Sequence, residues 1–220
     1  ASRVLRLRVG DAVQIFDGLG TECHGVIADL TGKRVVLDEL KAVDTMRESP
    51  LHTVLAQALC SSEKMDWILQ KATELGVNEI QPLDTERSVA KLSAERAEKR
   101  MTHWQQVAIA ACEQCGRNTL PIIHPPLDIM VWLATMRSQP YSRFILLPTG
   151  AQSLHTQARP VEKAVLIIGA EGGFTKAESD NALSCGFTPI RLGARVLRTE
   201  TAALAGLTAL QMQWGDFCTQ

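Results

Sequence analysis

Long hydrophobic runs are absent from this chain of 220 residues. No stretch reaches the roughly 18 consecutive apolar residues that a membrane-spanning helix needs, and the first residues do not show the pattern of a secretory signal peptide. We therefore expect a cytoplasmic protein. The net charge is also small, at −1 for pH 7. This balance argues against a protein that coats nucleic acid indiscriminately, although it leaves room for a local basic patch.

Several motifs of ligand-binding proteins are missing too. No GxxxxGKS/T sequence is present, so a phosphate-binding loop of that type is not supported. The sequence GAEGGF at 169–174 does not have the GxGxxG spacing of dinucleotide-binding folds, and no acidic residue follows at the distance of a ribose ligand. The five histidines share no ligand spacing. The single close cysteine pair, Cys112 and Cys115, lies in a predicted helix, so we predict buried thiols and no metal site.

Two hydrophobic patterns divide the chain. Residues 1–45 alternate short β-like runs with glycine-containing turns, which predicts a small β-barrel or sandwich. After a polar linker that ends at Pro50, strand-like runs alternate with helical patterns as far as 220, which predicts an α/β domain with a mainly parallel sheet. The strands predicted there are 51–59, 77–83, 144–147, 165–168 and 188–192, and the helices are 63–75, 94–115, 127–136, 176–185 and one after 201.

The best candidate for a binding site begins with the sequence VLIIGAEGGF. Val165–Ile168 is typical of a strand buried on both faces, and the glycines after it permit a turn that approaches a ligand closely. The strand after the next helix ends at a second glycine turn, at Gly193. Because the carboxyl ends of parallel strands meet at one edge of an open sheet, we expect these turns and the one at 147–150 to form a pocket.

Five sequence blocks give the chain a specific resemblance to a known family. They are GAEGGF (169–174), LGARVLRTETA (192–202), QKATELGV (70–77), ERS (86–88) and ACEQCGR (111–117). In these blocks the chain resembles the RsmE-type family of SPOUT methyltransferases, which use S-adenosyl-L-methionine to methylate N3 of a uridine in 16S ribosomal RNA. Ala170 and Ala194 stand where this family usually has proline, which loosens each turn without removing a reactive group.

The resemblance implies more than the hydrophobic pattern does. It implies that residues 50–220 form the deep trefoil knot of the SPOUT class, which sequence physics would not suggest because knotted chains are rare. It also implies that residues 1–45 form a PUA-like β-barrel that contacts RNA. The expected partners are 16S ribosomal RNA, within the small ribosomal subunit, and a second copy of the chain in a homodimer.

We expect the three turns to hold the cofactor mostly through backbone atoms. The expected cofactor-binding residues are Leu147, Pro148, Gly169, Glu171, Gly172, Gly173, Leu192, Gly193, Val196, Leu197, Arg198 and Thr201.

Three residues are candidates for a catalytic role. N3 of uridine is a poor nucleophile while it carries its proton, so a base or a nearby cation should help. We expect Arg198 and Arg87 to supply that cation or to hold the phosphate of the target, and Glu200 to accept a proton or orient an arginine. Arg87 could instead form a surface salt bridge, and Glu200 could simply favour a helix N-terminus through the helix dipole.

Five arginines are candidates for RNA contacts: Arg3, Arg6, Arg8, Arg87 and Arg117. The first three lie close together, and Arg6 and Arg8 share one face of a predicted strand. The alternative is that they only guard a solvated sheet edge with charge. For Arg117, at the end of a predicted helix, the RNA contact rests on the family resemblance.

Two other functions stay open at this point. A nucleotide-binding oxidoreductase of the NAD type would bind NAD but not S-adenosylmethionine. A non-catalytic RNA-binding module would bind RNA without transferring a methyl group.

Overall fold

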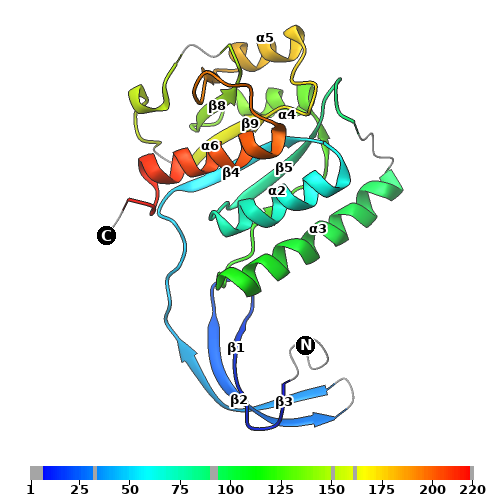
Figure 1. Cartoon of the computed structure of the whole chain (residues 1–220), viewed down its shortest axis with the longest axis vertical. Coiled ribbons are helices and arrows are strands. Elements are labelled where there is room, and N and C mark those ends of the chain that lie inside the picture. Colours follow the sequence, from blue (N-terminus) through cyan, green and yellow to red (C-terminus); the bar gives the residue numbers. More distant parts are fainter. Residues whose placement is uncertain (1–6, 32–33, 90–93, 150–151, 161–162, 219–220) are drawn as a thin grey trace. The chain divides into compact units, whose positions relative to one another are not determined.

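The computed structural model describes residues 7–31, 34–89, 94–149, 152–160 and 163–218. The chain divides into two compact units (Figure 1), one of residues 1–48 and 116–120 and the other of residues 49–115 and 121–220. Within the described ranges, no helix is both long enough and apolar enough to cross a membrane.

The segment 116–120 packs within the first unit, although the sequence analysis placed it in the α/β domain. The side-chain amide of Asn118 donates to the carbonyl oxygens of Gly20, at 3.2 Å, and Thr45, at 3.3 Å. The amide nitrogen of Leu120 donates to the carbonyl oxygen of Gly18 at 2.9 Å. The two contacts of Asn118 join residues 98 and 73 positions apart in the chain, and hydrophobic periodicity cannot predict contacts over such separations.

The first unit contains an antiparallel sheet of three strands in the order β1-β2-β3. The strands are β1 (Ala12–Phe16), β2 (Glu22–Thr31) and β3 (Arg34–Val43). At the turn between β1 and β2 the carboxylate of Asp17 accepts hydrogen bonds from the amides of Leu19, at 2.7 Å, and Thr21, at 3.0 Å. A further strand was predicted at 4–9. Residues 4–6 of it fall outside the described residues, and residues 7–9 are not a strand.

The second unit contains a sheet with the strand order β10-β8-β9-β4-β5-β6, in which β7 also pairs with β5. All of these pairings are parallel, as predicted. The strands are β4 (His52–Ala58), β5 (Glu79–Asp84), β6 (Ile122–Ile123), β7 (Leu127–Asp128), β8 (Ser142–Leu146), β9 (Lys163–Ile168) and β10 (Thr188–Ile190). The helices are α2 (Ser62–Glu74), α3 (Ala94–Cys115), α4 (Ile129–Met136), α5 (Lys176–Ser184) and α6 (Thr199–Trp214), with a short 3-10 helix, η1 (Leu154–Thr156).

Helices cover both faces of this sheet (Figure 1), so its central strands are buried on both sides. Alternate residues of a strand point to opposite faces. Thus Leu166 packs in the core with α2, α3 and α6, whereas Val165 and Ile167 pack in the core with α4 and α5. Burial on both faces explains why β4 and β9 are continuous apolar runs rather than alternating ones.

Helix α4 begins two residues later than predicted. Leu127 and Asp128 form the short strand β7, and Asp128 then caps the helix. Its Oδ1 accepts hydrogen bonds from the amides of Met130, at 2.8 Å, and Val131, at 3.1 Å. Aspartate is common at the N-cap position of helices. Asp128 therefore indicates the start of α4 in the sequence, although the apolar pattern alone suggested an earlier start.

The order of the strands changes one expectation about the candidate site. Strand β8 lies between β9 and β10, so the two glycine turns that follow β9 and β10 are not on neighbouring strands. All three strands are parallel, and their carboxyl ends therefore reach the same edge of the sheet. The turn after β8 therefore lies between the turns after β9 and β10 at that edge.

The amino-terminal edge of the sheet carries a charged cluster around Glu79. The Glu79 carboxylate lies 2.8 Å from Nε2 of both His52 and His124, and it also pairs with Lys163. The pKa of Glu79 is lowered, first by the hydrogen bond from His52 and then by Lys163 and His124, which together outweigh the opposing effect of burial.

We expect this cluster to make stability depend on pH. Because the pKa of Glu79 is lower in the folded state than its ordinary value of 4.5, the charged carboxylate stabilises the fold above that value. This contribution is lost as the pH falls below it. Glu79→Gln should be less stable than wild type by about 2 kcal/mol near neutral pH, and the difference should shrink in acid. Urea unfolding at a series of pH values measures it, and a pH-independent difference would contradict the assignment.

Candidate functional site

A cavity of about 460 Å³ opens at the carboxyl edge of the sheet, where the turns after β8, β9 and β10 meet. This size is within the usual range for small-molecule sites, roughly 300–1,000 Å³. Three chain segments, the start of α6 and one residue of α2 line it. The lining residues are Lys64, Leu146, Leu147, Pro148, Ile168, Gly169, Ala170, Glu171, Gly172, Gly173, Phe174, Arg191, Leu192, Arg195, Val196, Leu197, Arg198, Thr199 and Ala202.

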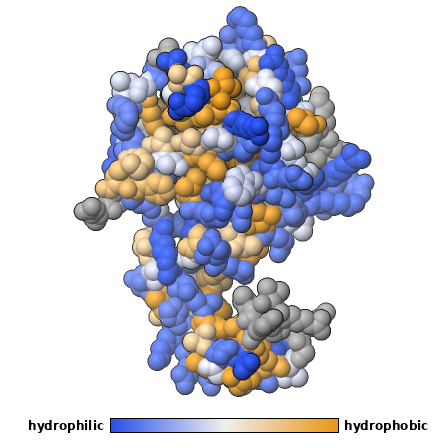
Figure 2. All heavy atoms as spheres, in the orientation of Figure 1, coloured by the Kyte–Doolittle hydropathy of each residue, from blue (hydrophilic) through white to orange (hydrophobic). Residues whose placement is uncertain are grey.

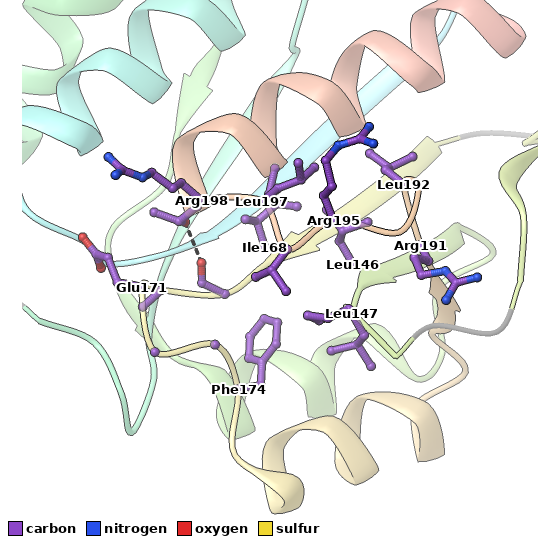
Figure 3. Close-up of a pocket in the computed structure, with 18 of the residues that line it drawn as sticks. Leu146, Leu147, Ile168, Glu171, Phe174, Arg191, Leu192, Arg195, Leu197 and Arg198 are labelled. Atoms are coloured by element: carbon purple, nitrogen blue, oxygen red, sulfur yellow. Dashed lines mark hydrogen bonds between the residues drawn. The ribbon is translucent and has the colours of Figure 1, made fainter.

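The cavity has an apolar middle and charged ends (Figure 3). Side chains of Leu146, Ile168 and Phe174 lie at its centre, whereas Glu171 and Arg198 lie at one end and Arg191 lies at the other. In the space-filling view, hydrophobic atoms adjoin strongly hydrophilic ones on the part of the second unit between α5 and α6 (Figure 2). Such a site suits a ligand with an apolar or aromatic body and polar ends.

The glycine turn after β9 is tightly folded. A Cβ atom on Gly169 would stand 3.2 Å from backbone atoms of Gly173, so a side chain there would push the turn open. Gly173 has a φ of +67°, which glycine adopts far more readily than other residues. A capping box follows this turn at the start of α5: Thr175 accepts from the amide of Glu178, and Glu178 accepts from the amide of Thr175.

Arg87 and Glu178 fix the position of this turn. The guanidinium of Arg87 donates to the carbonyl oxygens of Gly172, at 2.8 Å, and Phe174, at 3.2 Å. The carboxylate of Glu178, which is buried, accepts a hydrogen bond from the amide of Glu86 at 2.8 Å. The loop after β5 therefore holds the glycine turn from outside. Arg87 does not line the cavity, so its observed contacts are those of a positioning residue.

Thr199 ties the start of α6 to two strands. Its hydroxyl donates to the carbonyl oxygen of Gly169 at 2.6 Å and accepts from the side-chain amide of Gln57, on β4, at 2.9 Å. Both side chains are buried, and buried hydrogen bonds of this kind resist displacement. The floor of the cavity is therefore rigidly connected to the centre of the sheet.

Most of the expected cofactor-binding residues line the cavity, but Gly193 and Thr201 do not. Gly193 has a φ of +75° and serves the turn itself. Thr201 is exposed, because it lies on the face of α6 opposite to the buried Ala202 and Ala203. Neither residue is among those that line the cavity, and their contact with the cofactor stays a prediction.

The three candidate catalytic residues differ in position. Arg198 lines the cavity, and within the described ranges its guanidinium has no hydrogen-bond or ion-pair partner. Glu200 does not line the cavity; its Oε2 atom lies 3.8 Å from Nζ of Lys64. Arg87 braces the glycine turn, as described above. Of the three, only Arg198 lines the cavity, and its exposed side chain extends away from the apolar centre in Figure 3.

Sequence reasoning missed several lining residues. Lys64 lies more than 100 positions from the glycine turn, and its ammonium nitrogen is 3.0 Å from Oε1 of Glu171. Nothing in the sequence pattern of α2 indicated that Lys64 would line the cavity. Arg191 and Arg195 also line the cavity, and for these the flanking glycine turn was a usable signal.

The arginines expected to bind RNA have different outcomes. Arg3 and Arg6 lie outside the described residues, and Arg8 is exposed. Arg117 is only 4% exposed and is held by Glu48, with Nε to Oε1 at 2.9 Å and Nη2 to Oε2 at 2.5 Å. A guanidinium buried in such a pair is poorly placed to bind a phosphate, and the RNA contact of Arg117 stays a prediction that this ion pair disfavours. The described residues also hold no group of three or more histidine, cysteine or acidic side chains placed to bind a metal.

Comparison with known proteins agrees with this site. A family described as "RNA methyltransferase domain" matches residues 47–211, and one described as "RNA methyltransferase PUA domain" matches residues 2–40. The chain belongs to the RNA methyltransferase family. Among relatives of this RNA methyltransferase, the "Ribosomal RNA small subunit methyltransferase E" of Buchnera aphidicola is 34% identical over 98% of this chain and 85% of its own length. The protein of the same name from Bacillus subtilis is 30% identical, over 96% and 85%.

Solved structures of other RNA methyltransferases have the same fold. The Ribosomal RNA small subunit methyltransferase E of Neisseria gonorrhoeae, bound to S-adenosyl methionine, is 38% identical with a TM-score of 0.90, over 98% of this chain and 89% of that one. A Legionella pneumophila structure in complex with the same cofactor is 37% identical with a TM-score of 0.93, over 98% and 88%. These matches confirm the α/β methyltransferase fold and its PUA-like first domain. The trefoil knot stays a prediction.

Proposed function

We propose that this RNA methyltransferase transfers a methyl group from S-adenosyl-L-methionine to N3 of a uridine in the 16S ribosomal RNA of the small subunit. The observation that carries the proposal is the cavity at the three turns, in a chain whose relatives are named for methylation of this RNA. The NAD-type oxidoreductase is not favoured, because the family match at residues 47–211 covers most of the α/β unit.

The residues of the cavity fit S-adenosylmethionine. The cavity has room for an adenosine, and the turn at Gly169 and Gly173 forms a narrow cradle that a Cβ atom would fill. Backbone groups of the three turns would bind the polar edge of the adenine, and Leu146, Leu147 and Ile168 would pack against its apolar surface. The cofactor supplies an electrophilic methyl group and needs no metal. The protein's task is to hold donor and acceptor in line.

Arg198 is the residue best placed to assist the acceptor. Its unpaired guanidinium at the cavity wall can hold a phosphate of the RNA or stabilise a uracil ring that is losing its N3 proton. Burying an arginine in a protein ion pair would prevent both roles, as Arg117 illustrates. We therefore propose Arg198 as a catalytic residue and assign Arg87 to positioning.

The function is tested by mass spectrometry of ribosomal RNA. Small-subunit RNA from cells without this protein should have lost the methyl group of one uridine, and purified protein with S-adenosylmethionine should restore it in vitro. A complete methylation pattern in the deleted cells would contradict the proposal. RNA binding without any methyl transfer would instead favour the non-catalytic RNA-binding module.

We also propose a homodimer that acts in the cytoplasm, where the small ribosomal subunit is found. The apolar face of α6 that carries Leu207, Leu210 and Trp214 cannot form the dimer interface, because these three residues are buried within the subunit. Trp214 stacks on Phe144 with ring centroids 5.8 Å apart. Light scattering of the purified protein measures the subunit number, and a monomer at micromolar concentration would contradict the dimer.

We expect Arg87→Met to weaken the binding of S-adenosylmethionine about tenfold, that is by about 1.4 kcal/mol. The glycine turn would lose two hydrogen bonds from outside, while no atom in contact with the cavity would change. Calorimetric titration measures the affinity. Arg87→Lys keeps one donor and should lose less. If Arg87→Met instead lowers turnover at saturating cofactor and leaves cofactor affinity unchanged, Arg87 is a catalytic residue.

A further inference from the structure

Among the described residues that line the cavity, Lys64 alone comes from outside the three turns and α6. It belongs to α2, and its ammonium nitrogen lies 3.0 Å from Oε1 of Glu171 and 3.8 Å from Oε2 of Glu200. Glu171 lies in the glycine turn and Glu200 in the first turn of α6. Two carboxylates from different elements therefore direct one flexible side chain to the charged end of the cavity.

This placement does not favour the stability of α2. Lys64 lies in the first turn of a helix that begins at Ser62, where the positive end of the helix dipole disfavours a cation. The carboxylate of Glu171 offsets this, since it lies within 3.5 Å of the amide of Ser61 as well as near Lys64. Glu200 has a buried Oε2 atom without a hydrogen-bond partner among the described residues. The cluster thus holds a cation at a position where a helix alone would not select one.

The ammonium group stays protonated at the site. The pKa of Lys64 is raised, first by its hydrogen bond to Glu171, against the smaller opposing effect of burial. Lys64 is therefore a hydrogen-bond donor and a fixed positive charge rather than a base. Its side chain is still 31% exposed, so it can reach a ligand in the open cavity.

We propose that Lys64 is a catalytic residue that donates a hydrogen bond to a uracil carbonyl oxygen beside N3 of the bound uridine. This rests on the proposed function. When N3 loses its proton to water, the negative charge spreads onto the two carbonyl oxygens of the ring, and a fixed ammonium group stabilises it. The N3 lone pair then forms the bond to the methyl carbon while the methyl–sulfur bond breaks and its electron pair stays on sulfur. Lys64 itself is unchanged at the end of the step.

The first test compares Lys64→Gln with Lys71→Gln. Lys71 is a matched control because it lies on the same helix, is paired with Glu74 and has a similar side-chain exposure, 29% against 31%. Turnover is measured on small ribosomal subunits that lack the methyl group, and cofactor affinity is measured by calorimetry. Lys64→Gln should lower kcat by about 10²–10³-fold with cofactor affinity changed by less than about threefold. Lys71→Gln should keep wild-type kcat.

The dependence of kcat on pH separates a catalytic role from a structural one. Without the ammonium group the bound uridine should lose its N3 proton only at higher pH, so the deficit of Lys64→Gln should shrink as the pH rises. Lys64→Arg keeps the charge and should recover part of the rate. A deficit that is the same at every pH, or that comes from cofactor affinity alone, would overturn the proposal.

A double variant tests the remaining structural explanation. If Lys64 only neutralises Glu171, then Lys64→Gln combined with Glu171→Gln should restore near wild-type kcat, which would overturn the proposal. A rate no higher than that of Lys64→Gln would support it. The wild-type enzyme is assayed first: if it does not methylate N3 of a uridine, the proposed function fails, whereas an active wild type with a fully active Lys64→Gln contradicts only the role of Lys64.

Discussion

Replacing Arg198 with alanine is expected to lower kcat by about 10²–10³-fold, the usual effect of removing one group that stabilises charge in a transition state. Arg198 lines the cavity, and its guanidinium has no hydrogen-bond or ion-pair partner in the described part of the chain. It is the N-cap residue of α6, but its side chain makes no capping hydrogen bond. Its removal should therefore change catalysis without melting the helix. Single-turnover methylation of small subunits, together with the cofactor Kd, measures the effect.

Arg159→Ala is a suitable control for Arg198→Ala. Arg159 is also an exposed arginine without a partner in the described ranges, but it does not line the cavity. It should keep the wild-type rate, which would show that a general loss of positive charge is not responsible. Methylation by Arg198→Ala at close to the normal rate would remove Arg198 from the catalytic residues.

Gly169→Val is expected to weaken the binding of S-adenosylmethionine about 100-fold, which corresponds to about 2.7 kcal/mol. The first side-chain carbon alone would stand 3.2 Å from the backbone of Gly173 and 3.2 Å from the ring of Phe174. Two further methyl groups would have to displace the turn that lines the cavity. The shift would also disturb the carbonyl oxygen that accepts from Thr199. Calorimetry measures the affinity, and urea unfolding measures whether the fold survives.

Gly172→Ala is the matched control in the same turn. The three atoms nearest to a Cβ atom there all belong to the side chain of Arg87, the closest at 3.3 Å. A side chain can adjust by a few tenths of an ångström more easily than a folded backbone turn can. We expect a loss of cofactor affinity below about threefold. Equal losses of cofactor affinity for Gly169→Val and Gly172→Ala would show that the close packing at Gly169 is not what cofactor binding depends on.

The two basic groups of the site would have separate tasks if both proposals hold. Arg198 and Glu171, the partner of Lys64, lie at the same end of the cavity (Figure 3). A planar guanidinium binds phosphate with two parallel hydrogen bonds, whereas an ammonium group acts as a compact point charge. Lys64 is restrained by two carboxylates, and Arg198 is not. This difference suits Lys64 to one fixed oxygen on the base and Arg198 to the more variable RNA backbone.

Local signals predicted the elements and turns of the site well. Helix α5 was predicted to begin at 176, where Thr175 and Glu178 form a capping box, and helix α3 was predicted with its observed bounds, 94–115. The glycines in GAEGGF predicted a turn after the strand, and the structure shows that turn tightly folded, with Gly169 close to Gly173. Such features depend on neighbours three or four residues away, so the linear sequence contains all the information they need.

Contacts between distant segments were not predictable in the same way. The availability of an arginine depends on its partner: Arg117 and Arg198 are the same residue type near helix ends, but Glu48 binds only the first. Lys64 came into the site through a contact between residues 107 positions apart. No periodicity or motif contains such a pairing.

By itself, the sequence determined the division into a β-rich first part and an α/β second part, the position of the glycine turns and the resemblance to RNA methyltransferases. The tertiary structure decided which charges face the cavity. It placed β8 between β9 and β10, buried Arg117, turned Thr201 outward and brought Lys64 to Glu171. The physical reason is the sequence separation over which each interaction acts. Helix capping and the backbone freedom of glycine involve residues a few positions apart, whereas ion pairs and burial depend on which strands become neighbours in the sheet.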